Sequence, residues 1–139
     1  MSQCWSHFSH DADMGVRGQG ETLEQAFEQA GVALTAVICN PDTLSPQTRV
    51  EIHCEAPDIE LLFVDWLNDL IYQMATRKLL FGRFKVQISD QQLLGQAWGE
   101  PVDASKHAPA VEIKGATYTA LSVSKVQGNG WIAQCVVDV

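Results

Sequence analysis

An apolar stripe between positions 59 and 74 is the strongest constraint that this sequence places on its fold. Large hydrophobic residues recur there every three or four positions, the spacing that brings side chains to one face of an α-helix. The stripe consists of Ile59, Leu62, Phe63, Trp66, Leu67, Leu70, Ile71 and Met74. Asp58 precedes it and is a suitable N-cap, because its carboxylate can accept a first-turn backbone N–H. A stripe this broad must be covered, so we expect this helix to be the central element of the core.

A second helix is expected to begin after Thr22. Thr22 and Gln25 have the spacing of a capping box, in which the two side chains satisfy backbone N–H groups of the first turn. Apolar residues then recur at helical spacing at Leu23, Phe27, Ala30, Leu34 and Val37. The sequence Asn40-Pro41-Asp42 is typical of a helix end.

Most of the remaining chain has the pattern of β-strands. Residues 47–55 alternate between apolar and polar side chains, as a half-buried strand does. Residues 84–88 and 93–98 flank a turn sequence at 89–91, which predicts a hairpin. Further strands are expected at residues 4–8, 14–18, 111–118, 121–125 and 131–137, with a polar loop at 99–109.

The order of these elements predicts the fold class. Two helices among many strands, without one-for-one alternation, predict an α+β fold: a two-layer sandwich of two helices on a mixed or antiparallel sheet. The 139 residues suit a single domain over positions 1–139, long enough to bury a core of its own. A doubled strand-helix-strand module is compatible with this order, although no sequence repeat demonstrates a duplication.

The net charge of −8 narrows the classes of partner. It argues against direct, non-specific binding to nucleic acid, because that affinity comes from Lys and Arg on phosphates. No apolar run approaches the roughly 20 residues that a membrane helix needs, and the first five residues lack the basic and apolar regions of a signal peptide. We therefore expect a cytoplasmic protein. In a reducing compartment its four cysteines would be small buried hydrophobes: Cys4, Cys39, Cys54 and Cys135.

Two aspartates near opposite ends of the chain are the main candidates for a functional site. Chain ends of one domain often lie close together, so Asp13, Asp138 and the α-carboxylate of Val139 are expected to converge. Three oxygen anions repel unless a hard cation lies between them, and calcium or magnesium suits an all-oxygen site. Asp11 would face the same way as Asp13 in an extended segment. The alternative is that both are turn residues that bond their own backbone.

The other polar residues indicate no catalytic constellation. The sequence has no nucleophile elbow and no P-loop. Its histidines lack the spacing of a metal motif: His7, His10, His53 and His107. One face of the helix after position 58 is either solvated or binds a partner: Asp65, Asn68, Asp69 and Tyr72. The polar loop is either solvated or functional, and its charged residues are followed by two more: Glu100, Asp103 and His107, then Glu112 and Lys114.

Several segments, spread over nearly the whole chain, resemble the archease family. They are His10-Asp11-Ala12-Asp13-Met14-Gly15-Val16-Arg17, Trp66-Leu67-Asn68-Asp69-Leu70-Ile71-Tyr72, Gly99-Glu100 with Asp103 and His107, Glu112-Ile113-Lys114-Gly115-Ala116-Thr117-Tyr118, and Val137-Asp138-Val139. No single motif would suffice, but their order and spacing make the resemblance specific. It implies a fold of duplicated strand-helix-strand-strand modules.

The resemblance also implies a function. Archeases are protein cofactors of the GTP-dependent RNA ligase that joins 2′,3′-cyclic-phosphate or 3′-phosphate ends to 5′-hydroxyl ends in tRNA splicing and RNA repair. They promote guanylylation of the ligase and give it multiple turnovers. By this resemblance the chain is not itself an enzyme, the ligase is its partner, and RNA is contacted only indirectly. The family binds a divalent cation, usually described as calcium, with Mg²⁺ and Mn²⁺ as alternatives. Its ligands carry over to Asp13, Asp138 and Val139, with Asp11 as an additional candidate.

Two positions depart from the usual pattern of the family. Asp11 stands where the family commonly has Thr, and Thr119 stands where it commonly has His. A carboxylate at position 11 would strengthen cation binding or cap a turn, and any role of the histidine toward the ligase would be missing. Two other functions stay open. One is a small metal-dependent phosphoesterase that uses Asp11, Asp13 and Asp138, although a two-metal site needs more carboxylates. The other is a chaperone-like adaptor for RNA-modifying enzymes.

Overall fold

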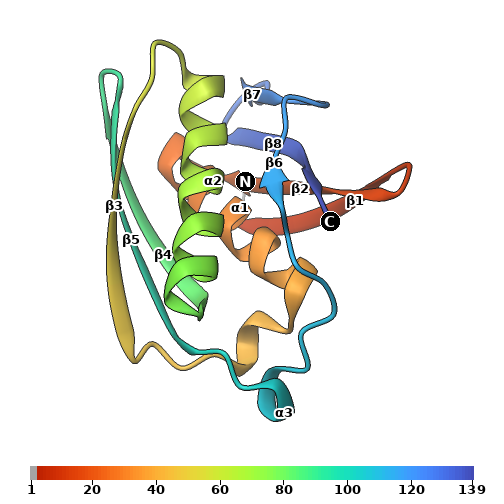
Figure 1. The fold of residues 1–139 in the computed structure, drawn as a ribbon. Helices are drawn as coiled ribbons and strands as arrows, with labels where there is room; N and C mark the ends of the chain where they lie inside the picture. The colour runs from red at the N-terminus through yellow and green to blue at the C-terminus, as the bar shows by residue number, and fades with distance from the viewer. Residues whose placement is uncertain (1–2) are drawn as a thin grey trace.

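Two antiparallel sheets lie on either side of the main helices in the computed structural model, which describes residues 3–139 (Figure 1). In chain order the elements are β1 (Cys4–His10), β2 (Asp13–Gly20), α1 (Leu23–Ile38), the 3-10 turn η1 (Pro41–Thr43), β3 (Thr48–Glu55), α2 (Ile59–Arg77), β4 (Leu79–Ser89), β5 (Gln92–Pro101), α3 (Ala104–His107), β6 (Gly115–Ala116), β7 (Ser122–Lys125) and β8 (Trp131–Asp138). The predicted α+β class is confirmed. Met1 and Ser2, which belong to the expected domain range, lie outside the described residues.

The larger sheet is assembled from both ends of the chain. Its strand order is β1-β2-β8-β6, and β7 also pairs with β8. β2 and β8 are antiparallel neighbours, and Met14 lies opposite Val137. Figure 1 shows the last strand beside the first hairpin. The last strand, β8, therefore pairs with the second strand, β2, and β1 lies on the other side of β2.

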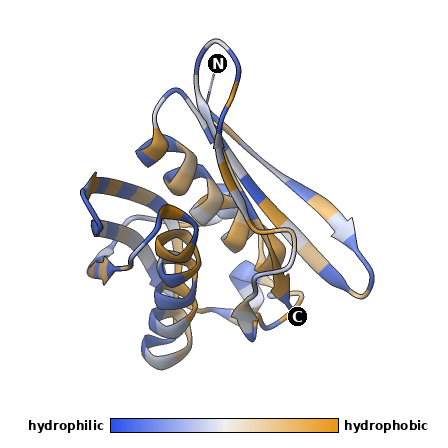
Figure 2. Cartoon of the chain, turned by 90° about the horizontal axis from the view of Figure 1, so that it is seen from above, coloured by the Kyte–Doolittle hydropathy of each residue, from blue (hydrophilic) through white to orange (hydrophobic). Residues whose placement is uncertain are grey.

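The smaller sheet has the order β3-β5-β4. The predicted hairpin is formed by β4 and β5 and turns at Asp90, whose φ of 56° is in the left-handed region that Asp tolerates. β3, α2, β4 and β5 follow one another as a strand-helix-strand-strand module. Hydrophobic and hydrophilic residues alternate along the strands (Figure 2), so each sheet offers one apolar face to the helices.

The core lies between the two sheets and around the helices. α1 contacts both β2 and β4, and α2 buries the apolar stripe that the sequence shows. Both N-caps are as predicted: Thr22 accepts the N–H of Gln25 at 3.1 Å, and Asp58 accepts the N–H of Leu61 at 2.9 Å. Three of the cysteines are buried as expected, whereas Cys4 is exposed. No helix within residues 3–139 is both long enough and apolar enough to cross a membrane.

Two segments differ from the sequence-based expectation. The strand expected at residues 111–118 pairs only at Gly115 and Ala116, because Ile113 leaves the ladder and is buried in the core. The polar loop expected at residues 99–109 begins within β5 and contains the short helix α3. Both segments form the connection from the smaller sheet to the larger one.

Candidate metal centre at the end of the larger sheet

Asp13 and Asp138 lie at the same end of the larger sheet. β2 begins at Asp13 and β8 ends at Asp138, one step beyond the pair of Met14 and Val137. Val137 is fully buried beneath the helices, so its neighbour Asp138 faces the opposite, outer side of the sheet. Met14 likewise packs against the core, so its neighbour Asp13 faces the outer side of the sheet. Since cross-strand neighbours share a face, the two carboxylates project from the outer face at this end.

Main-chain hydrogen bonds connect the segments around the two aspartates. The Val139 N–H donates a hydrogen bond to Asp13 Oδ1 at 3.3 Å. On the other side of β8, the Lys114 N–H donates to Asp138 O at 2.9 Å, and Gly115 lies opposite Asp138 in the ladder. The convergence of Asp13 with the end of the chain, expected from sequence, is thus present. The role of these three residues as metal ligands stays a prediction.

The negative charge of these two aspartates bears on what the site can bind. Within residues 3–139, neither Asp13 nor Asp138 forms an ion pair. Like charges on neighbouring strands are destabilising, and a hard cation with oxygen ligands would relieve that repulsion. However, no three His, Cys, Asp or Glu side chains in the described part of the chain gather closely enough to hold a metal ion. A cation held by the two carboxylates would therefore need further oxygen ligands from Val139, from water or from a partner protein.

Asp11 occupies the tip of the hairpin between β1 and β2. Its φ is 51°, so residues 11–13 are not extended, and the expectation that alternation turns Asp11 and Asp13 to one face is wrong. The carboxylate of Asp11 is 93% exposed, and its Oδ2 lies 3.8 Å from His10 Nδ1. Asp11 is a turn residue here, and its part in cation binding stays a prediction. His10 lies directly opposite Asp13 in the ladder, a placement that only the hairpin register reveals.

Asn68, one of the four residues on the polar face of α2, has a structural role that was not predicted from sequence. Its Oδ1 accepts the Ala116 N–H at 2.9 Å, so α2 holds β6 in place beside the end of β8. On the same helix face, Asp69 Oδ2 accepts a hydrogen bond from Cys54 Sγ at 3.2 Å. Asn68 is exposed and Asp69 is half-buried, so both side chains bond within the chain on a face that solvent still reaches. The one available signal was the position of Asn68 in mid-helix, where asparagine is unfavourable unless its side chain has a partner.

Thr119 has a main-chain role next to the site. Its carbonyl oxygen accepts the Val136 N–H at 3.0 Å, and its own N–H donates to Thr117 Oγ1 at 3.1 Å. The side chain of Thr119 is not needed for either bond. Both bonds use main-chain atoms of Thr119, so they do not depend on which side chain stands at this position.

A buried ionic network fixes the segment that leads to β6. Glu100 is only 5% exposed, and Lys106 Nζ donates to its two oxygens at 2.7 and 3.0 Å. It also accepts the Ser45 N–H at 3.1 Å. His107 Nδ1 accepts the Asp103 N–H at 2.9 Å, which assigns the imidazole proton to Nε2, 3.3 Å from Glu100 Oε1. The interpretation of the loop as solvated is therefore wrong for Glu100 and His107, which are buried, whereas Asp103 is exposed.

The Glu100 network predicts a pH-dependent stability. Hydrogen bonds from the Lys106 ammonium and from the Ser45 N–H lower the pKa of the Glu100 carboxyl to about 2. An unfolded glutamate has a pKa of about 4.3. Because the pKa of Glu100 is lower in the folded state than in the unfolded state, its ionised form stabilises the fold. This stabilisation is complete at pH values above the unfolded pKa, and it is lost as the pH falls through about 2.

We expect Glu100→Gln to lower the urea midpoint at neutral pH, because glutamine cannot form the ion pair with Lys106. The deficit relative to the unsubstituted protein should be about half as large near pH 3 as near pH 7, since Glu100 has by then lost about half of its stabilising contribution. Unfolding curves across this pH range test the expectation. Glu51→Gln is the matched control, because the Glu51 side chain is 62% exposed. An equal deficit at both pH values would contradict the ionic origin.

Comparisons with known proteins give a consistent result. The model of the Archease protein family matches residues 5–139. A protein of Pyrococcus furiosus named "Protein archease" is 38% identical over 139 residues, covering 97% of this chain and 98% of its own. The solution structure of protein 1598 of Methanobacterium thermoautotrophicum superposes with a TM-score of 0.84 at 27% identity, covering 97% of this chain and 98% of that one. A Thermotoga maritima crystal structure described as an archease, possible chaperone, shares the fold with a TM-score of 0.58 at 18% identity over 95% of this chain and 94% of that chain.

Proposed function

This chain belongs to the archease family, and on that premise we propose that it is a non-catalytic activator of a GTP-dependent RNA ligase. The ligase joins 2′,3′-cyclic-phosphate or 3′-phosphate RNA ends to 5′-hydroxyl ends in tRNA splicing and RNA repair. In this proposal the protein works in the cytoplasm, promotes guanylylation of the ligase and allows it multiple turnovers.

The observation that carries the proposal is the pair of carboxylates at the end of β2 and β8. Asp13 and Asp138 share the outer face, have no ion-pair partner within residues 3–139, and adjoin Val139 through its N–H bond to Asp13. The Lys114 N–H donates to Asp138 O and the Ala116 N–H donates to Asn68 Oδ1, and these bonds hold the surrounding segments in place. A rigid, uncompensated acidic group is suited to binding rather than to folding, because it gives the free protein no favourable ion pair.

We propose that Asp13, Asp138 and Val139 hold a divalent cation, with Ca²⁺ preferred and Mg²⁺ or Mn²⁺ as alternatives. The ligands are all oxygen atoms, which suits these hard cations. When bound, the cation would supply a positive charge that other oxygen ligands can share. With two carboxylates, the site leaves coordination positions that a partner can fill. The chain's own contribution is to present these oxygens on a fixed strand end.

Electrostatics favours a protein partner with a basic surface. The chain carries a net charge of −8, so phosphates would be repelled from most of it, and RNA is contacted only through the ligase. A cleft that binds RNA ends and GTP must be electropositive, and complementary charge increases the rate of association with such a cleft. The acidic end of the larger sheet would enter it and stabilise the state that accepts guanylylation.

The direct test is ligation under multiple-turnover conditions. Excess RNA with 2′,3′-cyclic-phosphate and 5′-hydroxyl ends is incubated with a small amount of ligase, GTP and a divalent cation, with and without this protein. We expect product to stop near one equivalent of ligase without the protein and to exceed it several-fold with the protein. A gel that resolves the guanylylated ligase reports the same effect at the first step. Equal product in both reactions would contradict the proposal.

Reactions without ligase separate the alternatives. Hydrolysis of simple phosphoesters by the protein with Mg²⁺ or Mn²⁺ would favour the phosphoesterase. Binding to several unrelated RNA-modifying enzymes, without any change in ligase turnover, would favour the chaperone-like adaptor. The activator predicts neither result.

A further inference from the structure

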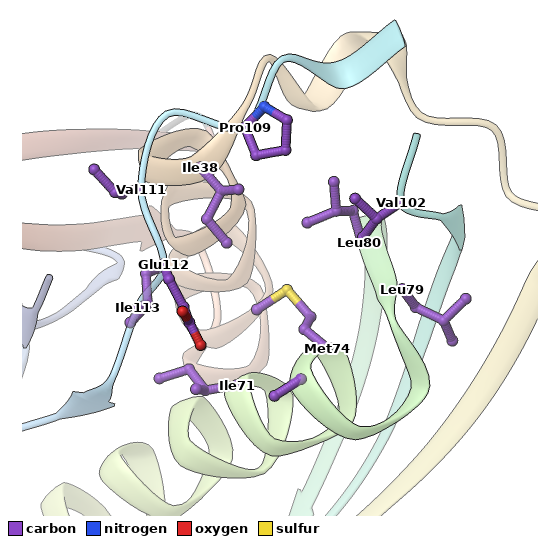
Figure 3. A pocket seen from close by; sticks show the side chains of 11 residues that line it. Ile38, Ile71, Met74, Leu79, Leu80, Val102, Pro109, Val111, Glu112 and Ile113 are labelled. Atoms are coloured by element: carbon purple, nitrogen blue, oxygen red, sulfur yellow. The ribbon is translucent and has the colours of Figure 1, made fainter. Parts of the chain in front are cut away.

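An apolar pocket of about 200 Å³ lies between the C-terminal part of α2 and the segment that joins α3 to β6 (Figure 3). Met74 points into it from α2, and Ile38 of α1 contributes to its lining. Of the described residues that line it, only Glu112 has a polar side chain. Val102 and Val111, which also line the pocket, are 41% and 39% exposed. Exposed apolar surface around a recess is typical of an interaction site.

The wall formed by this segment is held in place. The Val102 N–H donates to Lys78 O at 2.9 Å, and the Ala110 N–H donates to Ile38 O at 2.8 Å. Between these two bonds, α3 is anchored by the buried Glu100 network. After them, Ile113 is only 6% exposed and fixes the segment to the core. The pocket is therefore preformed, which lowers the entropic cost of filling it.

The size of the pocket selects the class of occupant. Sites for small molecules and cofactors have volumes of about 300–1,000 Å³, so this pocket is too small for most of them. An engineered apolar cavity of about 150 Å³ holds benzene. The pocket therefore has room for one large apolar side chain, such as leucine, methionine or phenylalanine. A single side chain inserted into a pocket is the usual anchor of a protein–protein contact.

The charge of Glu112 specifies what accompanies that side chain. Its carboxylate lies on the pocket beside Ile71 and Ile113 (Figure 3). Glu112 is exposed and forms no ion pair in the described part of the chain. A basic group on the occupant would meet this carboxylate, whereas an acidic group would be repelled.

We propose that this pocket docks a partner protein through a segment in which a large apolar side chain stands next to arginine or lysine. The apolar side chain fills the space in front of Met74, and the basic group pairs with Glu112. This interaction goes beyond the proposed cation site, because none of the residues involved belongs to that site and the contact requires no metal. Its test likewise requires no ligase, so it can fail while the proposed function holds.

The methyl group of Met74 allows a direct test by NMR. The chain has three methionines, Met1, Met14 and Met74, so ¹³C-methyl labelling gives one signal in the pocket and Met14 as an internal reference in the larger sheet. The probe is the peptide acetyl-Gly-Leu-Arg-Gly-amide. Matched peptides replace its leucine with serine or its arginine with glutamate. We expect a saturable shift of the Met74 signal with a Kd of roughly 1 mM, an unchanged Met14 signal, and no effect of the serine peptide.

Comparing the arginine peptide with the glutamate peptide measures how much Glu112 contributes to binding. The glutamate peptide should bind roughly two- to fivefold more weakly than the arginine peptide, the effect of one exposed ion pair. Glu112→Gln should remove most of this difference while leaving the leucine requirement unchanged. Equal binding of the two peptides to the unsubstituted protein would overturn the proposed basic group.

A substitution that fills the pocket tests whether the peptide binds there. Ala75 lines the pocket and is exposed on α2, so Ala75→Phe should abolish the shift without disturbing the core. Thr76→Phe adds the same ring one position further along the helix, outside the pocket lining, and should leave binding intact. No shift of Met74 with any peptide would overturn the proposal. A shift that depends on protein concentration alone would also overturn it, because a second copy of this chain would then be the occupant.

Discussion

Replacing Trp66 with alanine is expected to lower the free energy of unfolding by about 3–5 kcal/mol, the usual cost of removing a buried aromatic side chain. Trp66 is fully buried on α2, and its ring packs edge-on against Phe84 of β4 with 6.1 Å between centroids. Its Nε1–H donates to Phe27 O of α1 at 3.0 Å. A Cβ at Gly95 of β5 would overlap the same ring. One side chain thus joins both helices to the smaller sheet.

The loss should be large relative to the total stability, which is about 5–15 kcal/mol for a domain of this kind. Alanine leaves both a cavity and the Phe27 carbonyl without its indole donor, and an unpaired buried polar group adds to the cost. Urea unfolding followed by far-UV circular dichroism measures the change without relying on tryptophan fluorescence. Trp98→Ala is the control, because Trp98 is half-buried and its ring contacts the Arg83 guanidinium at 5.5 Å. If both substitutions cost the same, the central role of Trp66 is wrong.

The helices could be predicted from sequence because their determinants are local. Thr22 and Asp58 cap the two helices through bonds to residues three positions away. The apolar residues of α2 recur every three or four positions, so the helix can be recognised from the sequence alone. The segment at 111–118 was misjudged for the opposite reason. Val111 and Ile113 alternate as in a strand, but one lines a pocket and the other enters the core, while strand pairing starts only at Gly115.

The candidate site could be predicted only in part. The meeting of Asp13 with the chain end followed from the general proximity of termini, and the structure adds the strand order and the bond from Val139 that produce it. Glu100 was not foreseen as a buried anion, because one of its partners, Ser45, is 55 positions away in the sequence. The conformation of Asp11 likewise depends on where the hairpin turns, which alternation of side chains does not reveal.

Replacing Asp138 or Asp13 with asparagine is expected to abolish stimulation of the ligase while leaving the fold intact. Asparagine keeps the size of the side chain but removes its charge, and a cation held by two carboxylates should then bind at least about tenfold more weakly, a loss of 1.4 kcal/mol or more. Titration calorimetry with Ca²⁺ measures the affinity, and multiple-turnover ligation measures the stimulation. Both should fall together in each single variant.

Stability separates this prediction from damage to the protein. Asp13 and Asp138 carry like charges on neighbouring strands, so neutralising one of them should leave the metal-free unfolding free energy unchanged within about 0.5 kcal/mol or raise it. That outcome is the reverse of the one expected for Trp66→Ala.

Two matched substitutions show whether the loss of stimulation is specific to Asp13 and Asp138. Asp90→Asn makes the same charge change at the hairpin of the smaller sheet, and Asn tolerates the positive φ there, so stimulation should stay normal. Asp11→Asn tests the exposed turn residue beside the site, and only a small loss of cation affinity is expected because its carboxylate points to solvent. If Asp13→Asn and Asp138→Asn both stimulate the ligase normally, the acidic end of the larger sheet is not the part of this protein that acts on it.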